Sequence, residues 1–409
     1  MNSPIRRASC LWFHKTEEAD SVNNAATIFA AYYISSSVMT RRTWIVGAKA
    51  AICSSTNAAA WWLEPKPDMT RTFTSNPDLK SIAFPDGREW KGTPVDGRGR
   101  FVNLNHPFLP RTMDLLKWQL SPNPDRDRKK NDTFRPVLHG DKLFLDSSND
   151  CLVWLGHASF FLRLGGKRMI IDPVFGDIRP GPKRIWSPLF TAADFGELDY
   201  ILVSHDHRDH ADEASIRELY AKNPGTQFLT GLGMEPLLRE WTGKQQVQMA
   251  GWYQEYQTDG MTITYLPTRH WGRRGLTDTN KRLWGAFHIA YKGFSIYFSG
   301  DTGYDTHLAD VRTLFGAPDI CIIGVGAYKP EWFMGSNHIS PVNAMKAADE
   351  MGARMMIPMH YGTFDLSDEP MGDPYTVLQR AERGGKYNTE LRIAGVGEPI
   401  LCYNDSGTP

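Results

Sequence analysis

Cysteine is scarce in this chain of 409 residues, and its five cysteines show no pairing pattern. They are Cys10, Cys53, Cys151, Cys321 and Cys402, and no CxxC spacing occurs. The disulfide framework of a small secreted domain and a zinc ribbon both need closer, repeated spacings. The sequence therefore argues against both classes and predicts reduced or incidental cysteines.

Net charge is also lacking, because 46 Lys and Arg residues balance 46 Asp and Glu residues. Domains that bind nucleic acid usually carry a basic patch or stripe, so no nucleic-acid partner is expected. Apolar residues make up 41% of the chain and charged residues 22%, which is ordinary for a globular protein. The length suits two or three average domains, or one large domain with an extension.

Long apolar runs are missing as well, and no stretch matches a full transmembrane helix. The nearest, residues 43–63, reads TWIVGAKAAICSSTNAAAWWL and is interrupted by Lys49 and several polar residues. We predict a poorly ordered or surface-bound arm over residues 1–65, with an N-terminal membrane anchor in 43–63 as the alternative. The expected location is the cytoplasm or the surface of a membrane.

Turn-forming and charged residues dominate the next part of the chain, as in FPDGREWKGTPVDGRGRF and SPNPDRDRKKND. One amphipathic helix is expected over residues 111–120. We interpret residues 66–149 as an N-terminal extension that packs on a core domain over residues 150–405.

Strand and helix patterns alternate after residue 150. The predicted strands cover residues 160–164, 168–172, 200–204, 227–230, 261–267, 287–293, 294–301, 320–326 and 354–360. The predicted helices cover residues 212–222, 234–241, 307–316 and 340–352. This order favours a layered α/β sandwich. Since several of the strands end in His or Asp, a metal site along one sheet edge is expected.

The stretch SHDHRDH concentrates metal-ligand residue types directly after the apolar run YILV. Residues two apart in an extended loop point the same way, so His205 and His207 can bind one metal ion. Asp209 and His210 then face a second position. The charged start of a solvated helix would explain the acidic residues that follow, but not three clustered histidines.

Three more residues of ligand type lie at the ends of apolar strands: His270, Asp301 and His360. The seven candidates suit two metal ions, one held by three imidazoles and the other by two nitrogens and a carboxylate, with Asp301 between them. Nitrogen ligands with some oxygen suit zinc, with manganese or iron as alternatives.

The motifs resemble those of the metallo-β-lactamase-fold hydrolases, and more narrowly the branch of N-acylphosphatidylethanolamine-hydrolysing phospholipase D. The matching runs are WLGHASF, IIDPVF, GPKR, SHDHRDH, RHWGRRGLTDTNKRLWGAF, FSGDTGY, GAYKPEWFM, HISPVNAM and HYGTF. They span roughly residues 150 to 400 in order. The resemblance implies a four-layer αβ/βα sandwich with an N-terminal extension.

The resemblance also implies a ligand set and a reaction. One zinc ion would be held by His205, His207 and His270, the second by Asp209, His210 and His360, and Asp301 would bridge the two. A metal-bridging hydroxide would hydrolyse N-acylphosphatidylethanolamine to N-acylethanolamine and phosphatidic acid. Asp209, Asp301 and His338 are the expected catalytic residues, and His338 aligns with a family histidine at the substrate-facing rim. The alternative for His338 is a loop histidine that packs on Trp332 or Phe333.

Other interpretations use the same residues. A metal-dependent lactonase or sugar-phosphate hydrolase would share the ligand set, and a zinc-binding protein without catalysis is the alternative from another class. His157 is expected to support the ligands from outside, and His288 to be structural. A phospholipid substrate, peripheral membrane association and a homodimer are the expected partners.

A phospholipid substrate also requires surfaces that contact lipid. The apolar candidates are Trp186, Leu189, Phe190, Trp332, Phe333 and Met334. The basic candidates are Lys183, Arg184, Arg273, Arg274, Lys281 and Arg282.

Overall fold

The structure is a computed structural model that describes residues 71–243 and 247–402. The predicted arm over residues 1–65 and the anchor alternative over 43–63 lie outside the described residues, as do Cys10 and Cys53. Across the described ranges, none of the helices has the length and apolar character that a membrane crossing requires.

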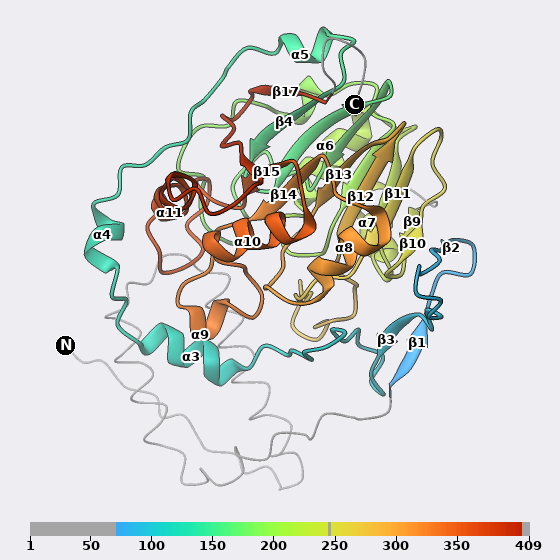
Figure 1. The fold of residues 1–409 in the computed structure, drawn as a ribbon, viewed down its shortest axis with the longest axis horizontal. Coiled ribbons are helices and arrows are strands. Elements are labelled where there is room, and N and C mark those ends of the chain that lie inside the picture. Colours follow the sequence, from blue (N-terminus) through green and yellow to red (C-terminus); the bar gives the residue numbers. More distant parts are fainter. Residues whose placement is uncertain (1–70, 244–246, 403–409) are drawn as a thin grey trace, which may run out of the picture.

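Two large sheets form the centre of the molecule (Figure 1). The first has the strand order β17 (Pro399–Leu401), β4 (Cys151–Gly156), β5 (Ser159–Leu164), β6 (Lys167–Ile171), β7 (Tyr200–Val203), β8 (Gln227–Gly231), β9 (Val247–Ala250). The second has the order β16 (Glu390–Leu391), β15 (Met355–Met359), β14 (Ile320–Gly324), β13 (Phe294–Phe298), β12 (Ala286–Tyr291), β11 (Thr262–Leu266), β10 (Gln254–Glu255), β2 (Lys80–Ser81). Both sheets are mixed, with parallel pairing from β6 to β9 and from β13 to β16.

Helices cover both sheets on their outer sides (Figure 1). On the first sheet these are α6 (Glu213–Lys222) and α7 (Glu235–Thr242), and on the second α8 (His307–Phe315), α10 (Pro341–Met351) and α11 (Asp373–Arg383). Two of them begin with a side-chain cap, since Asp212 accepts a hydrogen bond from the backbone N–H of Ser215 in α6 and Ser340 accepts one from that of Asn343 in α10. The predicted αβ/βα sandwich is confirmed.

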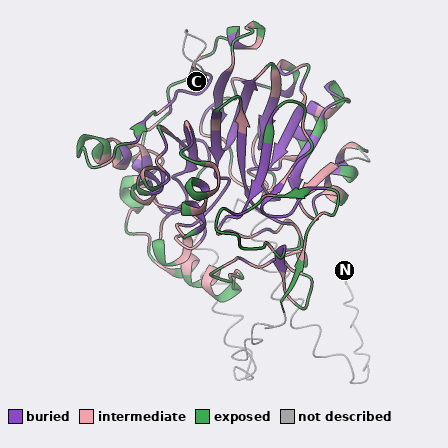
Figure 2. Ribbon diagram, turned by 45° about the vertical axis from the view of Figure 1, so that its right-hand side comes forward, coloured by how far each residue is buried: buried purple, intermediate pink, exposed green. Residues whose placement is uncertain are grey.

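The apolar core lies along the strands, which are mostly buried while the outer helix faces are exposed (Figure 2). All residues of β4, β5, β7 and β14 are buried. Such strands read as continuous apolar runs because both faces of the sheet are covered. All the predicted strands and helices are present, but β4, β9, α11 and several short strands were not predicted. Only Asp373, Pro374 and Leu378 of α11 are buried, so its apolar stripe is too thin to show in the sequence.

The segment before residue 150 packs against this core. Its strands β1 (Thr72–Thr74) and β3 (Thr93–Val95) pair with each other, while β2 extends the second sheet through β10. From residue 71 onward it also has the short helices α3 (Thr112–Leu120), α4 (Arg126–Lys130) and α5 (Leu143–Asp146). Its side chains Leu79, Phe84, Phe101 and Phe144 join the main apolar cluster. The division into an extension over 66–149 and a core domain over 150–405 stays a prediction.

Candidate metal centre

The predicted ligands all lie in loops at the carboxyl ends of strands. Residues 205–210 follow β7 of the first sheet, while His270, Asp301 and His360 follow β11, β13 and β15 of the second. The two sheets therefore each contribute part of one cluster. Loops at this edge can hold polar side chains in fixed positions because the strands beneath them are rigid.

Asp301 lies at the centre of the cluster. Its Oδ2 is 3.2 Å from Nε2 of His210 and 3.2 Å from Nε2 of His360. The same oxygen is 3.7 Å from Nε2 of His270 and 3.9 Å from Nε2 of His205. One carboxylate oxygen thus reaches histidines of both predicted sets, as a bridging position requires.

The ligand atoms form three groups, in each of which they lie within 4.8 Å of one another, and the third joins Asp301 and His360 to His338. The first group contains His205, His207, His270 and Asp301, and the second contains His157, Asp209, His210 and His360. The structure thus brings together all seven residues predicted as ligands. It adds His157 to the second group, where its Nε2 is 3.0 Å from Oδ2 of Asp209.

The charge states of these groups suit a cation. Burial, together with neighbouring histidines, holds the pKa of His205 well below its usual value, so its ring keeps a free lone pair. Burial alone would raise the pKa of Asp301, but the surrounding histidines, His210 first, hold it well below the usual range. Against the effect of burial, Asp301 and Asp209 raise the pKa of His360 to about 9. The carboxylates therefore favour positive charge at this position.

Unpartnered nitrogens support the same conclusion. Among the described residues, Nε2 of His205 and Nε2 of His207 are buried without a hydrogen-bond partner. Buried polar atoms are nearly always hydrogen-bonded, so such atoms call for an ion or another ligand. Neutral imidazoles beside carboxylates are the ligand types of zinc sites. The residues present fit the metal ions that the sequence predicts.

The other ring nitrogens of His205, His210 and His270 are held by neighbours. Nδ1 of His210 lies 2.7 Å from a carboxylate oxygen of Asp172, a fully buried residue. Asp172 also accepts hydrogen bonds from the backbone N–H and the hydroxyl of Ser204. Outer carboxylates of this kind orient a ligating imidazole. Asp172 lies in the motif IIDPVF and had no predicted role, although its position after β6 matches that of the predicted ligands.

A second supporting residue comes from the N-terminal segment. The side-chain amide of Asn103 donates a hydrogen bond to the carbonyl of His270 (2.8 Å) and its oxygen accepts one from the N–H of His270 (3.2 Å). Asn103 is buried and also accepts a bond from the indole of Trp284. Asn103 thus holds the backbone of a predicted ligand, His270, although the two residues are 167 positions apart in the chain. No local pattern in the sequence indicated this contact.

Backbone strain is concentrated at the same place. His157, Asp172 and His360 have φ values of 53°, 46° and 64°, in the left-handed region that side chains with a Cβ rarely adopt. Such strain persists where the surrounding contacts determine the conformation, and it is common at functional sites. The outer role expected for His157 is consistent with its burial and its contact with Asp209.

His338 lies on the open side of the cluster, with Nδ1 at 3.7 Å from Oδ2 of Asp301. Its ring neighbours are His270 and His360, at centroid distances of 5.2 and 5.3 Å. No ring contact with Trp332 or Phe333 is found within the described part of the chain, so the structure does not support the packing alternative.

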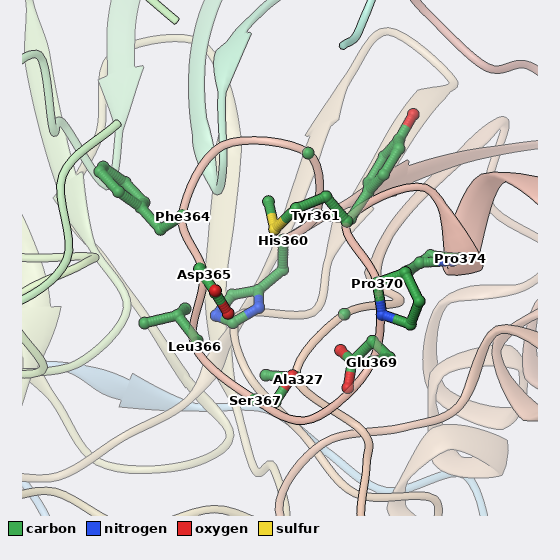
Figure 3. Close-up of a pocket in the computed structure, with 13 residues that line it drawn as sticks. Ala327, His360, Tyr361, Phe364, Asp365, Leu366, Ser367, Glu369, Pro370 and Pro374 are labelled. Carbon is green, nitrogen blue, oxygen red and sulfur yellow. The ribbon is translucent and has the colours of Figure 1, made fainter. Parts of the chain in front are cut away.

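The loop that leads to His338 is anchored to three other segments. Lys329 contacts Asp125 of the N-terminal segment at 2.9 Å and Asp373 of α11 at 3.2 Å. Buried Glu369 accepts hydrogen bonds from the backbone N–H groups of Tyr328 and Lys329. Figure 3 shows Glu369 beside a hollow that His360 also lines. These contacts hold the loop against the ligand loop that follows β15.

Several of the expected lipid-contact residues serve other purposes. Trp186 and Phe190 are 9% and 2% exposed and belong to the core, so their expected surface role is wrong. Trp332 is 48% exposed, as expected.

Three of the basic candidates are occupied inside the fold. Arg184 and Arg274 donate to backbone carbonyls, and Arg282 pairs with Asp206 and Asp278. The guanidinium groups of these arginines are therefore bound to other parts of the protein and are not free to contact lipid. The expected surface role of these three residues is wrong too.

Comparisons with known proteins agree with this geometry. A family model described as a beta-lactamase superfamily domain matches residues 167–361. The N-acyl-phosphatidylethanolamine-hydrolyzing phospholipase D 1 of Caenorhabditis elegans is 34% identical over 277 residues, which are 64% of this chain and 76% of that protein. The mitochondrial N-acyl-phosphatidylethanolamine-hydrolyzing phospholipase D of Saccharomyces cerevisiae is 33% identical over 244 residues, covering 57% of this chain and 52% of that one.

Among solved structures, an isothiocyanate hydrolase from Delia radicum gut bacteria superposes with a TM-score of 0.51 at 17% identity. The match covers 61% of this chain and 98% of that structure. At this identity the similarity supports the fold alone.

Proposed function

The chain belongs to the β-lactamase superfamily of metal-dependent hydrolases, in the branch of the N-acylphosphatidylethanolamine-hydrolysing phospholipases D, and from this premise we propose a phospholipase D activity. The substrate is N-acylphosphatidylethanolamine, and the products are N-acylethanolamine and phosphatidic acid. The observation that carries the proposal is the convergence of seven ligand-type side chains from two sheets around Oδ2 of Asp301.

Two zinc ions fit these residues. We assign one to His205, His207 and His270, the second to Asp209, His210 and His360, and a bridging position to Asp301. When bound, such a pair makes a hydroxide available at neutral pH and neutralises charge on a phosphodiester. The protein supplies fixed ligands, since Asp172 and Asn103 hold His210 and His270 in place.

His338 acts on the substrate side of this cluster. It is less buried than His270 and His360, its two ring neighbours, and it lies on a loop held by Lys329 and Glu369. From there its ring can donate a hydrogen bond to a phosphate oxygen or a proton to the leaving alkoxide. A His338→Gln variant keeps hydrogen bonding without proton transfer. A fall in kcat at constant KM therefore assigns proton transfer, and a rise in KM assigns binding.

The choice of substrate rests on the branch. The runs GAYKPEWFM and HYGTF surround the site, and the two curated relatives carry the substrate in their names. Water adds across the phosphorus–oxygen bond on the headgroup side, its oxygen stays on phosphatidic acid, and its proton balances the departing N-acylethanolamine.

The test measures metal content and lipid turnover in detergent micelles for wild type, Asp301→Asn and Asp259→Asn. The last is a matched control, because Asp259 is 84% exposed and pairs with Lys167 at the surface. We expect about two zinc ions per chain and phosphatidic acid from the wild type and the control. Asp301→Asn should lose more activity than the roughly 10- to 100-fold that follows loss of an outer-shell partner.

The reaction products distinguish the possible sites of attack and the possible substrates. In ¹⁸O-labelled water, label in phosphatidic acid supports attack at phosphorus on the headgroup side. Bound zinc with cleavage of a lactone or a sugar phosphate, but not of the lipid, would keep the site and replace the substrate. Peripheral membrane association, a location in the cytoplasm or at a membrane surface, and a homodimer stay predictions of this proposal.

A further inference from the structure

The metal cluster is open on one side. Of the seven predicted ligands, His207 and Asp209 are half-buried, while His205, His210, His270, Asp301 and His360 are buried. Arg208 lies between the two half-buried residues in sequence, and the ring of Trp271 contacts that of His207 at a centroid distance of 4.7 Å. Among the predicted ligands, the cluster is therefore most exposed at His207 and Asp209, beside Arg208 and Trp271.

Two loops meet at this opening through Arg208. Its guanidinium donates to the carbonyl of Arg179 at 3.0 Å and to that of Arg274 at 3.4 Å. The first loop carries Arg179 and Lys183, both exposed, and the second carries half-buried Arg273. We call Arg179, Lys183, Arg208 and Arg273 the basic rim. Arg208 stands between His207 and Asp209 in sequence and Arg273 follows His270 by three positions, while Arg208 ties the loop of Arg179 and Lys183 to them.

The basic rim is not neutralised inside the protein. In the described ranges, none of its four side chains has a carboxylate within ion-pair distance. The nearest carboxylates have other partners, because Asp206 and Asp278 pair with Arg282 and Asp177 accepts from the backbone N–H of Arg184. Four positive charges thus remain unpaired beside the opening although the whole chain has a formal net charge of zero.

An apolar side chain accompanies these charges. Leu276, at the tip of the loop that follows Trp271, is 47% exposed. The loop is held in shape by Asp278, which accepts hydrogen bonds from the N–H groups of Gly275 and Arg274. Cationic side chains next to an exposed leucine suit the headgroup layer of a membrane, where the charges meet phosphates and the leucine enters the apolar boundary.

We propose that the basic rim docks the protein on anionic lipid surfaces, with the open side of the metal cluster facing the membrane. This inference rests on the proposed lipid substrate, and it names the surface through which the substrate is delivered. The phospholipid then reaches the site without crossing bulk water. The product phosphatidic acid is itself anionic, so its accumulation strengthens docking.

The test is cosedimentation of the metal-loaded protein with vesicles of phosphatidylcholine, with and without phosphatidic acid. The double variant Arg179→Gln/Lys183→Gln removes two rim charges whose side chains make no hydrogen bond or ion pair with other described residues. Since each basic residue near an anionic surface contributes about 1 kcal/mol, partitioning should fall about 25-fold. Binding of the wild type should also weaken as salt is added.

The matched control is Arg383→Gln/Lys386→Gln. It removes the same two positive charges at the C-terminal end of α11. At 1.5 Å per residue, this end lies about 16 Å from the first turn of the helix. The control should bind like the wild type. Absence of wild-type binding to anionic vesicles, or equal losses in both double variants, would overturn the proposal. Binding of the wild type to DNA with the same affinity as to anionic vesicles, at the same salt concentration, would overturn it too. The basic rim would then bind polyanions in general.

The vesicles contain no N-acylated substrate, so docking is measured without hydrolysis. If docking fails while micellar substrate is cleaved, the surface is wrong and the proposed function stands. If rim-dependent docking holds without cleavage, the surface stands and the proposed activity is wrong. Loss of binding in a Trp332→Ser variant but not in the rim variant would assign docking to α9 (Glu331–Met334), which carries Trp332, and overturn the proposal.

Discussion

His288 gives a quantitative prediction about stability. It lies in the middle of β12, is 3% exposed, and stacks on Phe315 of α8 at a centroid distance of 4.0 Å. Thr264 and Tyr297 flank it on the neighbouring strands. Burial alone lowers the pKa of His288 to about 4, and no charged group contributes.

The sign of the effect follows from proton binding. With a pKa lower in the folded than in the unfolded chain, His288 binds a proton first in the unfolded state, so the free energy of unfolding falls as pH falls. The loss begins near the ordinary histidine value of 6.5 and ends near about 4. At about 1.36 kcal/mol per pK unit, His288 should cost roughly 2 kcal/mol between pH 7 and pH 5.

The assay is urea unfolding of wild type, His288→Leu and Ile289→Val at several pH values, followed by tryptophan fluorescence. Relative to wild type, His288→Leu should gain about 2 kcal/mol as the pH falls from 7 to 5. Ile289→Val, a change in the same strand without a titratable group, should show a constant loss of about 0.5–1.5 kcal/mol. Parallel curves for wild type and His288→Leu would refute the reasoning. Metal release at low pH affects all three proteins and cancels in the differences.

Three further predictions concern the metal cluster. Asn103→Ala removes both hydrogen bonds to the backbone of His270, so zinc affinity should fall about 10- to 100-fold in competition with a chelating dye; unchanged affinity would contradict the clamp. Gly326→Ala places a Cβ 2.0 Å from the carbonyl oxygen of His360, so metal content and Tm should both fall, while Gly176→Ala, with open space around it, should behave like the wild type. Removing metal with a chelator should lower Tm, because a ligand at about 100 times its Kd stabilises the folded state by about 2.7 kcal/mol; zinc should restore it.

The predicted ligands came from a pattern that is local in sequence. An apolar strand followed at once by His or Asp occurs at residues 205–210, His270, Asp301 and His360, and parallel strands place such ends at one edge. The positions of strands and helices could be predicted as well, because apolar residues recur with different periods in buried strands and in amphipathic helices.

The contacts that support the ligands could not be predicted from the sequence, because they join residues that are distant in sequence. Asn103 and His270 are 167 positions apart, and nothing in either local pattern specifies the partner. Arg282 and Arg273 look alike in the sequence, yet only Arg282 has carboxylates within reach in the fold. Which surface charges are free depends on tertiary packing, and a single sequence does not contain that information.

The distribution of the seven ligand-type residues over both sheets has a consequence for how the protein folds. Neither sheet holds a complete set of the seven, since residues 205–210 follow a strand of the first sheet and His270, Asp301 and His360 follow strands of the second. A refolding chain can therefore capture zinc tightly only after its two sheets have docked. In stopped-flow refolding experiments with a zinc dye, the time at which tight zinc binding appears would report when the two sheets dock. Zinc binding would thus measure the rate of a late stage of folding.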